Sequence, residues 1–193
     1  FLFARPHMAG ILLASLAVAL LFAARMGGIK RVVLVVATLP AAYAGVIFGL
    51  QFAGLGDAAA LTDIEDYFEV RQGYNLGSGS SVDISGMSLP ARFLTYMFRP
   101  MFLDAGGVLG LIVSVENALL AVMIISALVM KMLGRKSTLN LFAFIFFSAF
   151  VFVSWFVLSN VTANLGIAIR QKWMFLPMLL AIAFSYMPQV RRR

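Results

Sequence analysis

The sequence has no cysteine, one histidine and few charged residues of either sign. Without cysteine, a disulfide framework and a thiolate metal site are excluded, and one histidine cannot build a histidine-rich metal centre. Charged residues make up 12% of the 193 positions and hydrophobic residues 62%, whereas soluble domains are about 25% charged and about 45–50% apolar. With a mean hydropathy of +0.97, this composition excludes an ordinary soluble domain and a disordered chain, and it predicts a polytopic membrane protein.

Familiar motifs for nucleotide, cofactor or metal chemistry are also missing. The chain has no phosphate-binding glycine loop of the P-loop type, no dinucleotide fingerprint and no HExxH motif. The single histidine, His7, stands alone near the N-terminus, so a Ser-His-Asp catalytic set is not credible. We therefore expect no cofactor, no metal ion and no nucleic-acid partner.

Five apolar segments are long enough to cross a membrane, for which a helix needs about 20 residues. They cover residues 8–24, 32–55, 105–130, 139–159 and 173–190. Pro40 lies inside the second segment, which membrane helices tolerate. The sequence therefore predicts an all-α, polytopic transmembrane bundle of about five spans. Two spans fall in residues 1–56, an outer loop in residues 57–104, and three spans with a basic tail in residues 105–193.

The basic residues predict how these spans are oriented. Five spans place two short links and the C-terminal tail on the same side, and those three segments carry nine basic residues and no acid. They are Arg25, Lys30, Arg31, Lys131, Arg135, Lys136, Arg191, Arg192 and Arg193. Because cytoplasmic loops carry an excess of lysine and arginine, we assign this side to the cytoplasm. The loop at 57–104 is then periplasmic, and the protein lies in a bacterial inner membrane.

The outer loop is expected to have three parts. Residues 57–74 are predicted to form a helix with an acidic face, and residues 75–88 are rich in the glycine and serine typical of loops. Residues 89–102 are amphipathic and are predicted to form a helix at the membrane surface, with Pro90 in its first turn and its end at the Arg99-Pro100 step. Its apolar face would comprise Leu89, Phe93, Tyr96, Met97 and Met101. The alternative is that the loop simply caps the bundle.

Glu116 is the one ionisable residue deep within an expected span. A charge inside a membrane is costly, so this side chain should face the bundle interior and find a partner. Counting about 1.5 Å per residue from Asp104 places Glu116 about 18 Å into the membrane. Its role would be a general base, a proton relay or a sugar-binding carboxylate. The alternative is a structural helix–helix hydrogen bond made by Glu116, which has Asn117 as its neighbour in the sequence.

A second group of candidates lies in residues 160–172, which are polar at their start and basic at their end. The outer membrane face is expected to hold Asn164, Arg170 and Lys172. Basic residues are less common on this side, because lysine and arginine are concentrated in cytoplasmic loops. Arginine forks bind phosphate in a bidentate manner and lysine adds a point charge. With Arg92 and Arg99 they would form an anion site; the alternatives are lipid headgroup contact or pairing with the acidic segment at 63–69. We expect Asp104 to cap the third span.

Three strings together point to a known class of protein: SGSSVDIS at 78–85, FRPMFLDAGGVLGLIVSVENALL at 98–120 and NLGIAIRQKWMFLPMLL at 164–180. They resemble the C-terminal part of membrane proteins from bacterial polysaccharide clusters, similar to O-antigen or exopolysaccharide polymerases of the Wzy type. Members of that class have more spans, and this chain begins with Phe1, so we expect it to be part of a longer protein.

The resemblance implies an activity and a set of residues. It implies glycosyl transfer between repeat units carried on undecaprenyl diphosphate at the periplasmic face, with no metal ion and no nucleotide sugar. The matching positions are Arg99, Glu116, Asn164, Gly166 and Arg170. Glu116 would be the catalytic base, and the arginines would hold the lipid-linked oligosaccharide or another anionic lipid.

Two further functions remain open from the sequence. The chain would be a non-catalytic accessory or scaffold subunit that meets other membrane subunits, or a transporter of a lipid-linked glycan. A polymerase or a transporter predicts a cavity walled by Arg92, Arg99, Arg170 and Glu116. An accessory subunit predicts that these residues are paired within the chain and that the third and fourth spans present an apolar face.

Overall fold

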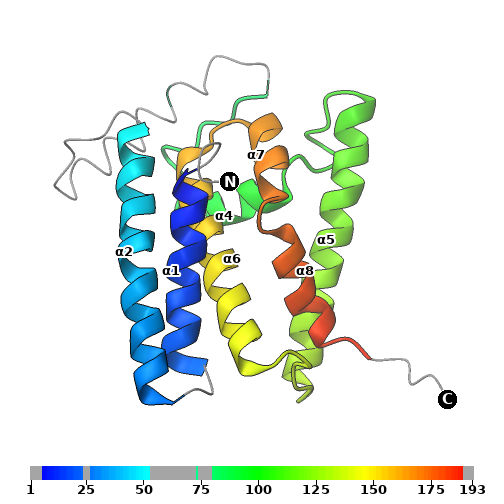
Figure 1. Ribbon diagram of the computed structural model, residues 1–193. Coiled ribbons are helices and arrows are strands. Elements are labelled where there is room, and N and C mark those ends of the chain that lie inside the picture. The colour runs from blue at the N-terminus through cyan, green and yellow to red at the C-terminus, as the bar shows by residue number, and fades with distance from the viewer. Residues whose placement is uncertain (1–5, 24–26, 53–72, 74–79, 189–193) are drawn as a thin grey trace. The chain divides into compact units, whose positions relative to one another are not determined.

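The computed structural model describes residues 6–23, 27–52, 73 and 80–188, and over these residues the protein is all-α. This confirms the all-α class, while the count of about five membrane spans stays a prediction. Figure 1 shows the helices, which are α1 (Pro6–Ala23), α2 (Gly28–Phe52), α4 (Leu89–Phe98), α5 (Val108–Met132), α6 (Leu141–Val161), α7 (Leu165–Lys172) and α8 (Leu176–Ser185). One isolated antiparallel bridge, between Ser81 and Asn164, joins two loops in the described part of the chain.

The chain divides into two compact units, and α6 contributes to both. The first unit comprises residues 1–70 and 140–154. Its helices α1 and α2 run antiparallel and side by side (Figure 1). Leu20 of α1 and Val35 of α2 are both buried, with Leu16 and Phe142 packed against them. The buried face of α1 is rich in small side chains, which let two helices approach closely.

The second unit comprises residues 71–139 and 155–193 and contains all the candidate site residues. Helices α4 and α8 both contact α5, and α4 also contacts α7. The buried residues of α5 are Ser114, Asn117, Leu120 and Ala127. Their spacing of three or seven residues places them on one face of the helix. At the far end of α8, the main-chain oxygen of Ser185 accepts a hydrogen bond from the Thr138 amide at 3.1 Å.

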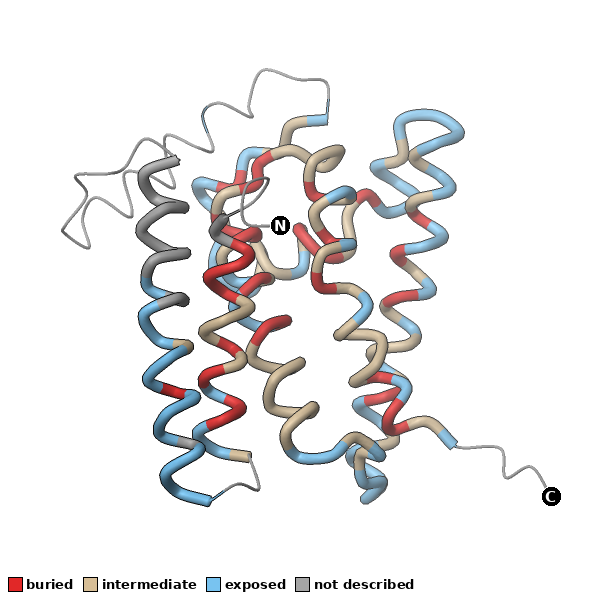
Figure 2. Tube along the Cα trace, viewed as in Figure 1, coloured by how far each residue is buried: buried red, intermediate tan, exposed pale blue. Residues whose placement is uncertain are grey.

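The opposite face of α5 is exposed and apolar (Figure 2). It carries Val108, Leu109, Leu111, Ile112, Val115, Leu119, Val122, Ile125, Leu128, Val129 and Met132. Soluble proteins seldom expose an apolar surface of this extent, whereas a lipid bilayer solvates it. Helices α5 and α6, with mean hydropathies of 2.4 and 2.5, are long and apolar enough to span a membrane.

The fifth expected span covered residues 173–190, but the helix found there, α8, extends only from Leu176 to Ser185. The structure instead pairs α8 with α7, which begins at Leu165, before the expected start, and the two helices are bent by 58° across a short break. Counted as a broken span, this pair raises the number of candidate spans from two to three in the part of the chain that the structure describes. Helices α1 and α2 cover the first two expected segments, and α2 continues through Pro40.

The outer loop follows the prediction only in part. The acidic helix expected at 57–74 lies outside the described residues, apart from Gly73. Helix α4 begins at Leu89 and ends at Phe98, because Arg99 adopts an extended conformation before Pro100, as that step predicted. Met101 therefore lies beyond the helix and outside its apolar face, and Leu89 at the helix start is 51% exposed.

The middle of the expected face is buried within the second unit. Tyr96 and Met97 are almost fully enclosed. The ring of Phe93 lies 5.1 Å from the ring of Trp155, centroid to centroid. The Trp155 indole N–H also donates to the Phe93 carbonyl at 3.1 Å. Helix α4 is therefore fixed by side-chain packing and by a main-chain hydrogen bond.

The absence of cysteine allows the predicted orientation to be tested with single cysteines. Gly86 and Lys136 are both exposed, and a side chain added at Gly86 meets no neighbour. We expect Gly86→Cys to react with a membrane-impermeant maleimide on intact cells, since its loop is predicted to be periplasmic. Lys136→Cys should react only after the membrane is permeabilised. The reverse pattern would contradict the orientation deduced from the basic residues.

Candidate functional site

Lys172, the last residue of α7, is buried and hydrogen-bonded within the chain. Its side chain is 5% exposed. The Lys172 ammonium donates to the main-chain oxygen of Met97 at 2.8 Å and to Oδ1 of Asn117 at 2.8 Å. Met97 lies in the last turn of α4, where carbonyls have no partner within the helix and carry partial negative charge. The ammonium therefore supplies a donor to the Met97 carbonyl at the end of α4 and connects this helix to Asn117 of α5.

Asn117 extends this contact to the segment that follows α4. Its Nδ2 donates to the Pro100 carbonyl oxygen at 2.9 Å. The Ser114 hydroxyl lies within 3.3 Å of the same oxygen and 2.8 Å from the Gly110 carbonyl oxygen. Ser114 and Asn117 are three residues apart and so lie on the same face of α5. We call the group Met97, Pro100, Ser114, Asn117 and Lys172 the lysine network.

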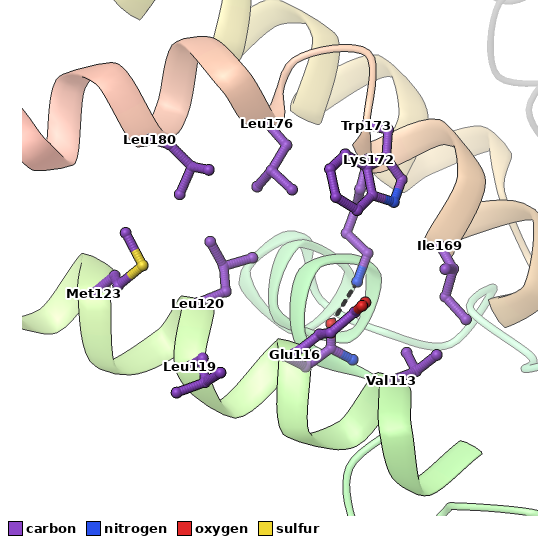
Figure 3. Close-up of a pocket in the computed structure, with 11 residues that line it drawn as sticks. Val113, Glu116, Leu119, Leu120, Met123, Ile169, Lys172, Trp173, Leu176 and Leu180 are labelled. Carbon is purple, nitrogen blue, oxygen red and sulfur yellow. Dashed lines mark hydrogen bonds between the residues drawn. The ribbon is translucent and has the colours of Figure 1, made fainter. Parts of the chain in front are cut away.

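A cavity of about 210 Å³ lies beside the lysine network, between α5 and the α7–α8 pair (Figure 3). Most of its lining is apolar: Val113, Leu119, Leu120, Met123, Ile169, Trp173, Leu176 and Leu180. Its polar lining consists of Glu116, Asn117 and Lys172. Figure 3 shows the side chains of Glu116 and Lys172 directed toward each other across this region.

Glu116 occupies an open position at this cavity. Its side chain is exposed, and its charge interacts favourably with that of Lys172. Because α5 begins at Val108, Glu116 lies eight residues into the helix, about 12 Å along its axis at 1.5 Å per residue. The expectation of about 18 Å was counted from Asp104 along a continuous helix, whereas residues 104–107 are not helical and α5 begins at Val108.

Arg92 is fully engaged by neighbouring acceptors. Its Nε donates to the Met87 carbonyl at 3.0 Å, and its two terminal nitrogens donate to the Ser85 carbonyl and to Oδ1 of Asn160, each at 3.0 Å. The guanidinium thus connects the loop before α4 to the end of α6. This arrangement stabilises the loop, and it uses all three nitrogens of the side chain within the chain.

Arg99 forms a bidentate ion pair with Asp104. Its Nε lies 2.8 Å from Oδ2 and its terminal nitrogen 3.1 Å from Oδ1 of Asp104. This hydrogen-bonded guanidinium lowers the pKa of Asp104 from its ordinary value of 3.8. The sequence predicted that Asp104 would cap the third span, but in the structure Asp104 does not cap α5. The N-cap position belongs to Gly107, whose φ of 88° suits glycine.

Asn164 caps α7 and connects it to the loop at 80–82. Its Oδ1 accepts from the Ile167 amide at 3.2 Å and from the Ser80 hydroxyl at 3.3 Å. Two main-chain hydrogen bonds join the same segments. The Val82 amide donates to the Ala163 carbonyl at 2.8 Å, and the Leu165 amide donates to the Ser80 carbonyl at 3.0 Å. Asparagine directly before a helix is a standard N-cap, so this role was readable from the sequence.

Arg170 differs from the other basic candidates. Its side chain is exposed, and no hydrogen bond or ion pair joins it to another residue in the described part of the chain. Arg92, Arg99 and Lys172 each have different partners, and the three arginines do not line the cavity. The structure thus brings Glu116 and Lys172 to the lining of one cavity, and none of the three arginines lines it.

Three contributors were not identified from the sequence. Ser114 and the Pro100 carbonyl take part in the lysine network, and Trp173 lines the cavity. Ser114 could have been identified from its spacing, since it lies three residues before Asn117 and therefore on the same face of α5. Among the residues that the structure describes, no group of three or more His, Cys, Asp or Glu side chains could hold a metal ion.

Comparison with family models, curated proteins and solved structures found no match to this chain. Its function must therefore be inferred from the chemistry of the residues described above.

Replacing Lys172 tests whether the lysine network stabilises the fold. We expect Lys172→Met to lower the free energy of unfolding by roughly 2–4 kcal/mol, because two buried acceptors lose a charged donor. Denaturant unfolding of the protein in detergent micelles measures the change. Lys136→Met, at an exposed position, is the control and should fall within about 0.5 kcal/mol of the unchanged protein. Equal stabilities for the two variants would contradict a structural role for the ammonium.

The ion pair of Asp104 predicts a small, pH-dependent effect. Since the folded-state pKa of Asp104 is lowered, the pair stabilises the fold at pH values above the unfolded-state pKa, and this stabilisation is lost as the pH falls through the folded-state pKa. We expect Asp104→Asn to cost under about 1 kcal/mol at neutral pH, because the pair is partly exposed. The stability difference between Asp104→Asn and the unchanged protein should shrink below pH 3.8. A difference that persists at low pH would exclude the ion pair as its cause.

Proposed function

We propose that this chain acts in the assembly of lipid-linked polysaccharide at the periplasmic face of a bacterial inner membrane, as a membrane protein of about five spans. The observation that carries the proposal is the meeting of the three strings that resemble Wzy-type polymerases. The string at 98–120 supplies Pro100, Ser114 and Asn117, and the string at 164–180 supplies Lys172.

The string at 78–85 joins the same unit through Ser80, which is hydrogen-bonded to Asn164. Lys172 is separated from Asn117 by 55 residues and from Met97 by 75 residues along the chain. Two of the three strings thus meet in the lysine network, and the third is hydrogen-bonded to Asn164 at the start of the string at 164–180. Their convergence supports a common function for the residues that they carry.

Glu116 is the residue best suited to the chemistry of glycosyl transfer. Its carboxylate would take the proton from an acceptor sugar hydroxyl. The hydroxyl oxygen would then bond to the anomeric carbon of the donor sugar, while the bond from that carbon to the lipid diphosphate breaks and the diphosphate leaves with the electron pair. Lys172 lies beside Glu116 in the lining of the cavity, so a positive charge stands near the carboxylate in this step.

Arg170 is the cation best placed to bind the diphosphate leaving group. An exposed guanidinium can make bidentate hydrogen bonds to phosphate oxygens and stabilise the charge that develops there. Arg92 and Arg99 are hydrogen-bonded within the chain, so we assign them a supporting role in holding the loop around α4. Asn164 has a similar supporting role as the cap of α7.

Substitutions in the intact gene test this assignment. We expect Glu116→Gln and Arg170→Ala each to reduce long polysaccharide chains at the cell surface at least about tenfold with normal protein abundance, since each removes a group that acts on the transition state. Arg170→Lys should not restore them if the contact is bidentate. Arg135→Ala, on the predicted cytoplasmic side, is the matched control. Unchanged polysaccharide in the Glu116→Gln and Arg170→Ala variants would remove the catalytic assignment.

A non-catalytic accessory subunit is the second candidate, and two observations favour it. Arg92, Arg99 and Lys172 are all engaged within the chain, as this alternative requires. The exposed face of α5 is also apolar along its full length and could meet a membrane subunit instead of lipid. In that case polysaccharide would be lost on disrupting α5 packing but retained in Glu116→Gln.

A further inference from the structure

Trp173 follows α7 at the break before α8 and is the one aromatic residue in the lining of the cavity. Its side chain is 60% exposed. Figure 3 shows the indole next to Lys172 and on the same side of the cavity as Ile169. A large aromatic ring therefore stands at the open part of a cavity whose polar groups lie close by.

The turn that carries Trp173 is anchored on both sides. Lys172 is held by its two buried hydrogen bonds. Phe175 is fully buried, and its ring stacks on that of Tyr96 with centroids 6.4 Å apart. Main-chain hydrogen bonds from Met174 to Gln171 at 3.0 Å and from Phe175 to Lys172 at 3.2 Å close the turn. The exposed indole is thus presented from a fixed backbone, which reduces the entropy lost when a ligand binds.

The groups around the indole suit a ligand with both polar and apolar parts. Glu116 supplies carboxylate oxygens that accept hydrogen bonds from hydroxyl groups. An ammonium has three N–H donors, and Lys172 uses two of them within the described chain. Trp173 offers a flat apolar face with a polar edge. Beyond these groups the cavity continues along Leu119, Met123 and Leu180.

We propose that Trp173 is a platform for the sugar ring of a single-chain glycoside, with the hydrocarbon chain entering the cavity and the sugar hydroxyls meeting Glu116 and Lys172. The proposal rests on the function proposed above and deepens it by naming the ligand class that this site selects. The cavity has a volume of about 210 Å³, and its apolar lining beyond the polar groups suits a hydrocarbon chain.

Binding of radiolabelled octyl β-D-glucoside to the full chain in lipid nanodiscs tests the proposal, with empty nanodiscs as the background. We expect saturable binding that Trp173→Leu weakens about tenfold, the scale of an aromatic contact. Trp173→Phe, which keeps an aromatic face, should bind within about threefold of the unchanged chain, since most of the stacking surface remains. Phe184→Leu is the matched control, because Phe184 is 57% exposed on α8 and does not line the cavity.

Competitors separate the parts of the ligand. Octan-1-ol has the chain without the sugar and glucose has the sugar without the chain, so both should compete at least about tenfold more weakly than octyl glucoside if both parts contribute. Equal competition by octanol would overturn the proposal, as would unchanged binding in Trp173→Leu or the absence of saturable binding. Glucose linked to the octyl chain through a phosphate group is the third competitor. If the site selects a lipid-phosphate-linked sugar, this compound should bind more tightly than octyl glucoside. If the site selects a simple glycolipid, it should not.

The proposal can fail separately from the proposed function. If Trp173→Leu keeps full glycoside binding while Glu116→Gln abolishes surface polysaccharide, Trp173 is not the platform and the polysaccharide function stands. If Trp173→Leu loses glycoside binding while Glu116→Gln leaves surface polysaccharide unchanged, the sugar site stands without a catalytic role for Glu116.

Discussion

The ammonium of Lys172 is the group on which the second unit depends. It is buried, and a buried charge is costly unless hydrogen-bonded partners compensate for its lost water. Met97 and Asn117 provide those partners, and Asn117 in turn holds the Pro100 carbonyl. Through these contacts one side chain connects α4, α5 and α7. The position of the break before α8, and hence of the cavity, follows from where this connection fixes α7.

Much of the helical arrangement could be predicted from the sequence, since long apolar runs and the Arg99-Pro100 step are local signals. The partners of the basic residues could not. Lys172 was expected to contribute to an anion site at the outer membrane face, with lipid headgroup contact as an alternative. One of its acceptors is instead the main-chain oxygen of Met97, and a main-chain acceptor cannot be recognised from residue identity. Similarly, the pairing of Arg92 with Asn160 joins residues 68 positions apart. Such contacts depend on the fold as a whole, whereas the Asn164 cap depends only on its own helix.

The structure separates two sets of groups within the candidate site. Arg92, Arg99, Asn164 and Lys172 are engaged by partners in the chain and maintain its shape. Glu116, Arg170 and Trp173 are exposed and can act on a ligand. A rigid polar network thus supports a smaller group of accessible side chains, an arrangement that suits binding or catalysis because the reactive groups are held in place.

The most direct test of this account is a double-mutant cycle that combines Lys172→Met with Asn117→Leu in denaturant unfolding experiments. If the two side chains belong to one network, their effects are not additive, and the coupling energy should exceed about 1 kcal/mol, within the range for groups in direct contact. Additive effects would show that Lys172 and Asn117 contribute independently. The lysine network would then not be the interaction that holds α4, α5 and α7 together.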